Sequence, residues 1–113
     1  KSFIPQLFLP HKRLVNKLDI ENLIQRGSQI NKNTLIAYTK AMQTRESNAN
    51  LIQNINIPVQ FIIGKKDQSV SFNDSVKQLQ IPKAAHVLIL EDSGHMSVFE
   101  QPEIVIKSLK NFI

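Results

Sequence analysis

The chain has 113 residues, which is enough for one domain and too few for two of ordinary size. With 42% hydrophobic and 20% charged residues it has a globular composition, and no apolar run approaches the roughly 20 residues that a membrane helix needs. The net charge of +5 comes from Lys and Arg scattered along the chain without interleaved aromatic residues, which argues against nucleic-acid binding. There is no cysteine, so disulfides and thiolate metal sites are excluded.

The first residues, KSFIP, contain neither an initiator Met nor a signal segment. We therefore expect the chain to be cut from a longer one. Because the true N-terminus is then not visible, the absence of a targeting sequence says nothing about location, and the cytoplasm is taken as a default expectation.

Residues 1–54 are rich in polar residues and are predicted to form helices. In the first stretch, Leu14, Val15 and Leu18 recur at helical spacing. A second helix is predicted to begin at Asp19 as its N-cap and to end near Gly27.

A third helix is predicted from the cap candidate Asn33, because Leu35, Tyr38 and Met42 then fall on one face. No glycine-rich or charged linker follows this helix. The helical part is therefore expected to lead directly into the next structural unit.

The pattern changes in the second half of the chain. Residues 59–63 and 86–90 are apolar runs with β-branched members, typical of strands in a parallel sheet. Between them, a short helix is predicted to end at Pro82, and its apolar face consists of Phe72, Val76 and Leu79.

After the second strand, Pro102 occupies a favourable first position for a last helix. The apolar stripe of this helix consists of Val105, Ile106, Leu109, Phe112 and Ile113. The order strand, helix, strand, helix predicts an α/β fold with two parallel strands and a right-handed crossover.

Two residues with complementary chemistry follow the predicted strands. Asp67 comes just after the first strand and His95 just after the second. Because the carboxyl ends of parallel strands meet at one edge of a sheet, both side chains are expected there. A carboxylate beside an imidazole accepts the Nδ1 proton and stabilises the imidazolium that forms when the other nitrogen takes a proton. Either residue alone would more often be an ordinary loop residue, so the prediction of an acid–base pair depends on their joint position.

Around these two residues the sequence resembles enzymes of the α/β-hydrolase fold family. The segment IPVQFIIGKKDQSV has that family's order of Pro, apolar strand, Gly, two residues and Asp, and LILEDSGHMSVFEQPEIVIKSLKNFI resembles its C-terminal segment. The resemblance covers residues 57–113 well and residues 35–56 loosely. The matching positions are Gly64, Asp67, Gly94, His95, Glu100 and Pro102.

In that family the chain order is nucleophile, acid, histidine. The resemblance therefore implies that Asp67 is the acid and His95 the general base of a catalytic triad. It also implies that residues 55–113 are the C-terminal part of the core and residues 1–54 the end of a helical lid. Met96 and Val98, beside His95, would form pocket wall, with ordinary packing as an equal alternative.

The chain departs from the family in lacking a nucleophile. Its glycines, Gly27, Gly64 and Gly94, cannot form the Gly-x-Ser-x-Gly elbow, and Ser28 lacks the preceding strand and the second glycine. The oxyanion-hole segment, which precedes the elbow, is missing too. The chain alone is therefore expected to be inactive.

The leading expectation is the C-terminal part of a serine hydrolase that acts on a small ester-like or related carbonyl substrate and needs no cofactor. Two alternatives stay open: a non-catalytic scaffold or interaction module with this fold, and an epoxide or haloalkane hydrolase with an Asp nucleophile. No partner beyond the small substrate is expected. The isolated chain is expected to self-associate, because the apolar strand at residues 59–63 would have an open edge.

Other polar residues are given structural roles. His11 and His86 are interpreted as surface or edge residues, and without Cys or helical ligand spacing no metal site is expected. Asp92 is interpreted as a loop cap and Asp74 as a solvated helix residue. For Arg45 a salt bridge between lid and core is favoured over contact with a substrate carboxylate.

Overall fold

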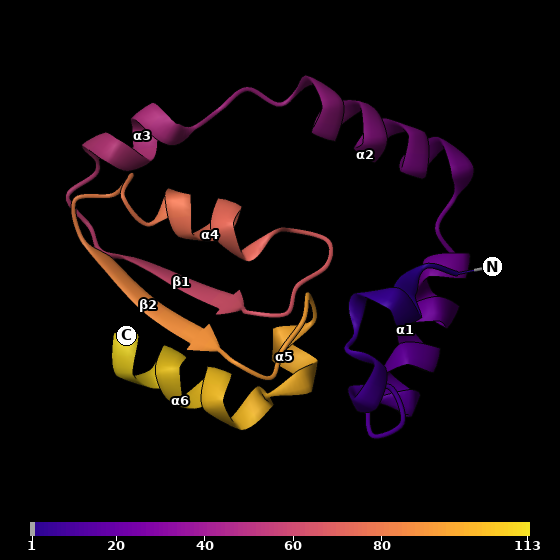
Figure 1. The fold of residues 1–113 in the computed structure, drawn as a ribbon. Coiled ribbons are helices and arrows are strands. Elements are labelled where there is room, and N and C mark those ends of the chain that lie inside the picture. The colour runs from indigo at the N-terminus through magenta and orange to yellow at the C-terminus, as the bar shows by residue number, and fades with distance from the viewer. Residues whose placement is uncertain (1) are drawn as a thin grey trace.

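A computed structural model describes residues 2–113, which form a mixed structure of helices and two strands (Figure 1). Two short 3₁₀-helices come first, and six α-helices and two strands follow. In chain order the elements are η1 (Ile4–Leu7), η2 (Pro10–Lys12), α1 (Lys17–Ser28), α2 (Lys32–Thr44), α3 (Ala49–Asn54), β1 (Val59–Gly64), α4 (Phe72–Gln78), β2 (Ala85–Leu90), α5 (Ser97–Glu100) and α6 (Pro102–Phe112).

The second half of the chain is a parallel strand pair between helices. β1 and β2 pair in parallel, in a register that runs from Val59 opposite Ala85 to Gly64 opposite Leu90. In Figure 1, α4 lies on one side of the strand pair and α6 on the other. The predicted order strand, helix, strand, helix is confirmed, and so is Pro102 as the first residue of the last helix.

The predicted N-caps of the first two α-helices are wrong. Asn16 precedes α1, and Asp19 lies within its first turn, while the helix continues one residue past Gly27. At α2 the N-cap is Asn31, whose side chain accepts a hydrogen bond from the Asn33 backbone N–H at 2.7 Å. In both helices an earlier polar residue takes the cap position, which the apolar spacing alone could not distinguish.

The apolar residues that recur at helical spacing in the first stretch face outward. Leu14, Val15 and Leu18 are 85%, 78% and 74% exposed, and the chain before α1 forms 3₁₀ turns rather than an α-helix. Phe8 and Leu9 are buried there instead, at 1% and 5% exposure. Pro10 disfavours a helical conformation at the residue before it, and Leu9 is accordingly extended, with φ −59° and ψ 140°.

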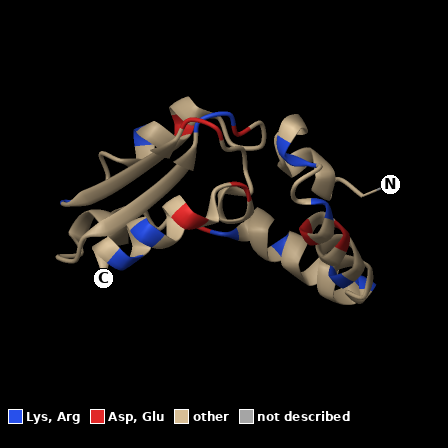
Figure 2. Cartoon of the chain, turned by 90° about the horizontal axis from the view of Figure 1, so that it is seen from below, with Lys and Arg blue, Asp and Glu red and all other residues tan. Residues whose placement is uncertain are grey.

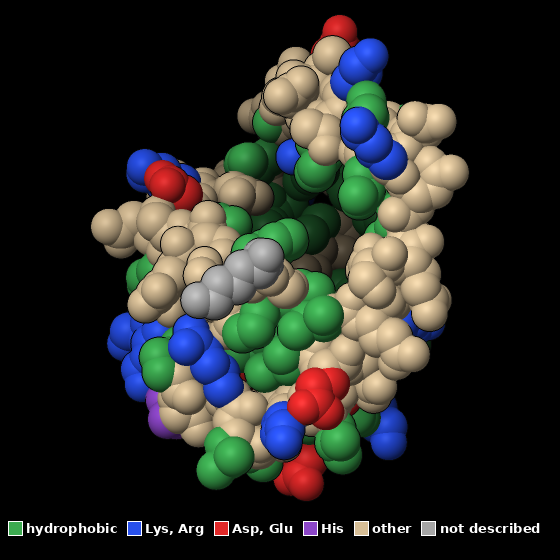
Figure 3. Space-filling view, turned by 90° about the vertical axis from the view of Figure 1, so that its right-hand side faces the viewer, with side chains coloured by type: hydrophobic (Ala, Val, Ile, Leu, Met, Phe, Trp, Pro, Cys, Tyr) green, Lys and Arg blue, Asp and Glu red, His purple; other side chains and the backbone are tan. Residues whose placement is uncertain are grey.

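Helix α2 forms as predicted but has no buried residue. Its predicted apolar face is solvent-exposed, with Leu35, Tyr38 and Met42 at 48%, 66% and 67%. Figure 1 shows α2 arching away from the sheet, and Figure 3 shows hydrophobic side chains gathered around a hollow in the face that it borders. Within residues 2–113, nothing covers this helix face.

We expect the isolated 113-residue chain to self-associate. The sheet of the described residues has only two strands, which leaves one edge of each strand unpaired. A two-stranded sheet is marginal in water, and an open apolar edge pairs readily with another chain. Light scattering over a dilution series should show concentration-dependent assembly. Hydrogen exchange should show protected amides at Gln60 and Ile62, whose N–H groups face away from β2 because alternate residues of β1 donate to it. A folded monomer at every concentration, with these two amides unprotected, would contradict the expectation.

The charged side chains lie on several elements rather than on one surface. Figure 2 shows Lys and Arg on the helices and loops of both halves, with Asp and Glu among them. No helix within residues 2–113 is long and apolar enough to cross a lipid bilayer.

Candidate active site

The structure brings together the two residues that the sequence paired. Asp67 follows β1, His95 follows β2, and the imidazole Nδ1 lies 2.9 Å from Asp67 Oδ2. The other carboxylate oxygen, Oδ1, accepts hydrogen bonds from the backbone N–H groups of Ser69 (2.7 Å) and Val70 (3.1 Å). One oxygen is thus held by the loop after β1 and the other faces the imidazole.

The side chains of Asp67 and His95 differ in exposure. The Asp67 side chain is 13% exposed and the His95 side chain 40%. No residue of the described chain is hydrogen-bonded to His95 Nε2. An imidazole with a carboxylate at Nδ1 and an accessible Nε2 can take up and release a proton there.

Backbone contacts fix the two loops to each other. The Lys65 N–H donates to Leu90 O at 2.9 Å and the Lys66 N–H to Ser93 O at 3.0 Å, which extends the strand pairing into the loops. A Cβ atom at Gly64 would overlap the Gly94 carbonyl oxygen. The glycine therefore allows the close approach of the two loops that places Asp67 beside His95.

No periodic pattern in the sequence predicted the segment that holds the histidine loop from outside the sheet. The His95 N–H donates to Leu7 O at 3.2 Å, and the Phe8 ring lies 6.0 Å from that of Phe99, between centroids. Glu100 is buried at 6% exposure and contacts the same segment. Residues 7–9 have no hydrophobic period and lie between prolines, so no sequence pattern marks them as a structural element. The Glu-x-Pro signature marked Glu100 but not its partner segment.

The two residues predicted as pocket wall differ in burial. Met96, directly after His95, is half-buried, whereas Val98 is 58% exposed. Their assignment to a substrate pocket stays a prediction.

Asp92 is not the loop cap that the sequence suggested. Its carboxylate forms ion pairs with His11 (3.1 Å), Lys12 (3.3 Å) and Lys66 (2.9 Å). Hydrogen bonds from Lys66 and from His11 hold the pKa of Asp92 well below its usual range. Because the folded-state pKa is depressed, the cluster contributes stability above the usual aspartate pKa, and this is lost as pH falls through the folded-state value. Two lysines and a histidine contact this side chain together, and these contacts replace the turn that local sequence favoured.

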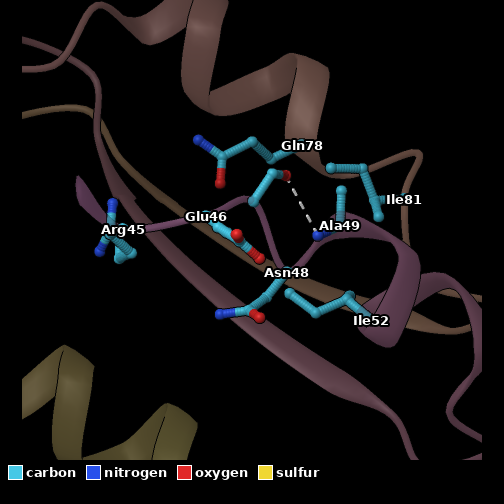
Figure 4. Close-up of a pocket in the computed structure, with 8 residues that line it drawn as sticks. Arg45, Glu46, Asn48, Ala49, Ile52, Gln78 and Ile81 are labelled. Atoms are coloured by element: carbon cyan, nitrogen blue, oxygen red, sulfur yellow. Dashed lines mark hydrogen bonds between the residues drawn. The ribbon is translucent and has the colours of Figure 1, made fainter. Parts of the chain in front are cut away.

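The salt bridge expected for Arg45 does not form among the described residues. Arg45 instead borders a cavity of about 460 Å³ (Figure 4). Neither Asp67 nor His95 lines this cavity, so it is not part of the acid–base site. The residues around it are Arg45, Glu46, Ser47, Asn48, Ala49, Ile52, Gln78 and Ile81.

The predictions for Asp74 and His86 agree with the structure. Asp74 is exposed and pairs with Lys77 at 2.8 Å. His86 is exposed and lies edge-on to Phe112, with ring centroids 5.2 Å apart. Among residues 2–113, no three His, Cys, Asp or Glu side chains are grouped as they would be around a metal ion.

Comparison with solved structures places this geometry in a known fold. A thermophilic esterase from Thermogutta terrifontis matches 96% of the chain with a TM-score of 0.85 and 19% identity. An esterase from Exiguobacterium antarcticum matches 60% of the chain (TM-score 0.54, 20% identity). A serine hydrolase involved in carbazole degradation matches 70% (TM-score 0.59, 19% identity). No protein-family model matches the sequence, and neither does any curated protein.

The chain spans only part of these structures: 40% of the Thermogutta terrifontis esterase, 25% of the Exiguobacterium antarcticum esterase and 31% of the carbazole-pathway hydrolase. At these identities the likeness concerns the fold and not the chemistry. The chain therefore has a part of the α/β-hydrolase fold, which confirms the fold class that the sequence predicted.

Proposed function

We propose that this chain is the C-terminal part of a serine hydrolase acting on a small ester-like or related carbonyl substrate. In this proposal Asp67 is the acid and His95 the general base of a triad, and the nucleophile lies outside residues 1–113. Residues 1–54 form the end of a lid and residues 55–113 the end of the catalytic core.

The observation that carries the proposal is the contact between Asp67 Oδ2 and His95 Nδ1 at 2.9 Å, at the carboxyl ends of two parallel strands. The two backbone N–H groups that hold Oδ1 orient the carboxylate before any substrate binds. The ester class is suggested by the proteins with the same fold, two described as esterases and one as a serine hydrolase.

The proposed reaction follows from the proton transfers that this pair can make. His95 Nε2 takes the proton of a serine hydroxyl as the hydroxyl oxygen attacks the ester carbonyl, and Asp67 stabilises the imidazolium that results. The imidazolium then gives this proton to the departing alkoxide, which leaves an acyl-enzyme. A water molecule is deprotonated in the same way, attacks the acyl group and releases the carboxylic acid, with the proton returned to the serine.

The test compares the complete enzyme that contains these residues with the 113-residue chain alone. We expect the complete enzyme to hydrolyse p-nitrophenyl acetate and to be labelled by a fluorophosphonate probe at one serine outside residues 1–113. The chain alone should hydrolyse the ester no faster than buffer with free imidazole and should not be labelled, because an acid and a base cannot form an acyl-enzyme without a nucleophile.

Peptide mapping of the labelled protein locates the serine. Label on any serine of residues 1–113 would show that the nucleophile has been misplaced. A complete protein that neither hydrolyses esters nor reacts with the probe would point to a non-catalytic member of the fold.

A further inference from the structure

Among residues 2–113, one carboxylate is buried, and it does not belong to the pair of Asp67 and His95. Glu100, the last residue of α5, is 6% exposed, and no cation of residues 2–113 forms an ion pair with it. A buried charge of this kind is costly unless hydrogen bonds compensate it. Its surroundings should therefore supply donors.

Three donors converge on this carboxylate. Oε1 accepts from the Leu9 N–H at 2.7 Å, while Oε2 accepts from the Gly94 N–H at 2.7 Å and from the Ser93 hydroxyl at 2.9 Å. Leu9 is 91 residues away in sequence, whereas Ser93 and Gly94 directly precede His95. The carboxylate thus joins the N-terminal segment to the loop that carries the imidazole.

The same two segments also meet at the histidine itself. The His95 N–H donates to Leu7 O at 3.2 Å. A Cβ atom at Gly94 would come within 3.3 Å of Leu7 O and 3.5 Å of Glu100 Oε1, so the packing around this peptide is close. The backbone on the N-terminal side of His95 is therefore held from two directions, by the Leu7 carbonyl and by the Glu100 carboxylate.

We infer that Glu100 is a positioning residue that holds His95 in register with Asp67. It acts through the Gly94 peptide and not through contact with substrate, and it requires residues 7–9 as its second anchor. This inference rests on the proposed function, because its effect on turnover needs a catalytic His95.

The variant that tests it is Glu100→Gln in the complete enzyme. An amide has only one oxygen, so its NH₂ group must face either the Leu9 N–H or the Gly94 N–H, donor against donor. The Gly94 peptide then shifts, and with it the imidazole. We expect kcat to fall on the order of 10²-fold, as for a displacement of a reacting group by about 1 Å, with little change in KM.

A second readout reports the geometry without relying on turnover. The Nδ1 proton shared between His95 and Asp67 gives a downfield resonance in a sample labelled with ¹⁵N-histidine, assigned by its loss in His95→Ala. We expect Glu100→Gln to shift this resonance upfield. The matched control is Glu103→Gln, which removes the same charge from an exposed position three residues later and should change neither kcat nor the resonance.

Wild-type kcat and an unmoved resonance in folded Glu100→Gln would overturn the inference. If Glu100→Gln does not fold, the test is Ser93→Ala, which removes one hydrogen-bond donor and leaves the carboxylate in place. A small upfield shift of the resonance together with a small loss of kcat would support the inference. No change in the resonance or in kcat would refute it. Failure of the proposed function would look different, because the complete protein would then show no ester hydrolysis, or would keep it in His95→Ala, while the resonance still reported on Glu100.

Discussion

Asp67→Asn in the complete enzyme is expected to lower kcat on the order of 10⁴-fold, the effect known for loss of the acid in a serine triad. The structure gives the reason. Asp67 Oδ1 accepts two backbone N–H groups, so the single oxygen of the amide would stay with them and its NH₂ group would face His95 Nδ1. Nδ1 must then accept, and the neutral ring carries its proton on Nε2, where it cannot take one from the nucleophile.

His95→Ala is expected to remove nearly all turnover, because no other described imidazole lies beside Asp67. The measurement is kcat and KM for p-nitrophenyl acetate, with circular dichroism to verify that each variant folds. The matched control is Asp92→Asn, which removes a carboxylate three residues before His95. It should leave kcat within about threefold of wild type, because exposed ion pairs contribute little. If it proved as damaging as Asp67→Asn, the assignment of the acid would be wrong.

The sheet and the acid–base pair could be predicted because the signals that specify them are local. A continuous apolar run marks each strand, and the topology of a parallel pair then places the residues after both strands at one edge. That geometry needs no knowledge of side-chain packing, so Asp67 and His95 were found although they are far apart in sequence.

The first third of the chain was predicted less well because distant contacts determine its structure. Leu14, Val15 and Leu18 recur at helical spacing, yet they are exposed, and the buried residues are Phe8 and Leu9. These two pack against α5 and Glu100, beyond the reach of any periodicity within residues 1–34. The predicted N-caps of α1 and α2 were wrong because several Asn and Asp residues near each helix start are suitable for the cap position.

Gly64→Ala is expected to destabilise the complete enzyme by about 3 kcal/mol, the upper end of what an added core methyl usually costs. None of the chain's glycines has a positive φ, so backbone strain is not the cause. The cost is steric: the new Cβ would overlap the Gly94 carbonyl oxygen and lie 2.8 Å from Ser93 O. Both atoms belong to the backbone of the loop that carries His95, and Ser93 O already accepts the Lys66 N–H. They can give way only if the loop moves.

Gly27→Ala is the matched control, with the opposite sign. Gly27 lies inside α1, and its added Cβ would meet only Ile4 Cδ1, at an ordinary 3.8 Å. Ala in a helix interior is more favourable than Gly by about 0.5–1 kcal/mol, so this variant should be slightly more stable than wild type. Urea unfolding of both variants gives the two free energies, and kcat should fall with Gly64→Ala alone, because the displaced loop carries His95 away from Asp67. Equal stability of the two variants would show that the loops do not approach as closely as the structure has them, and the placement of Asp67 beside His95 would lose its steric basis.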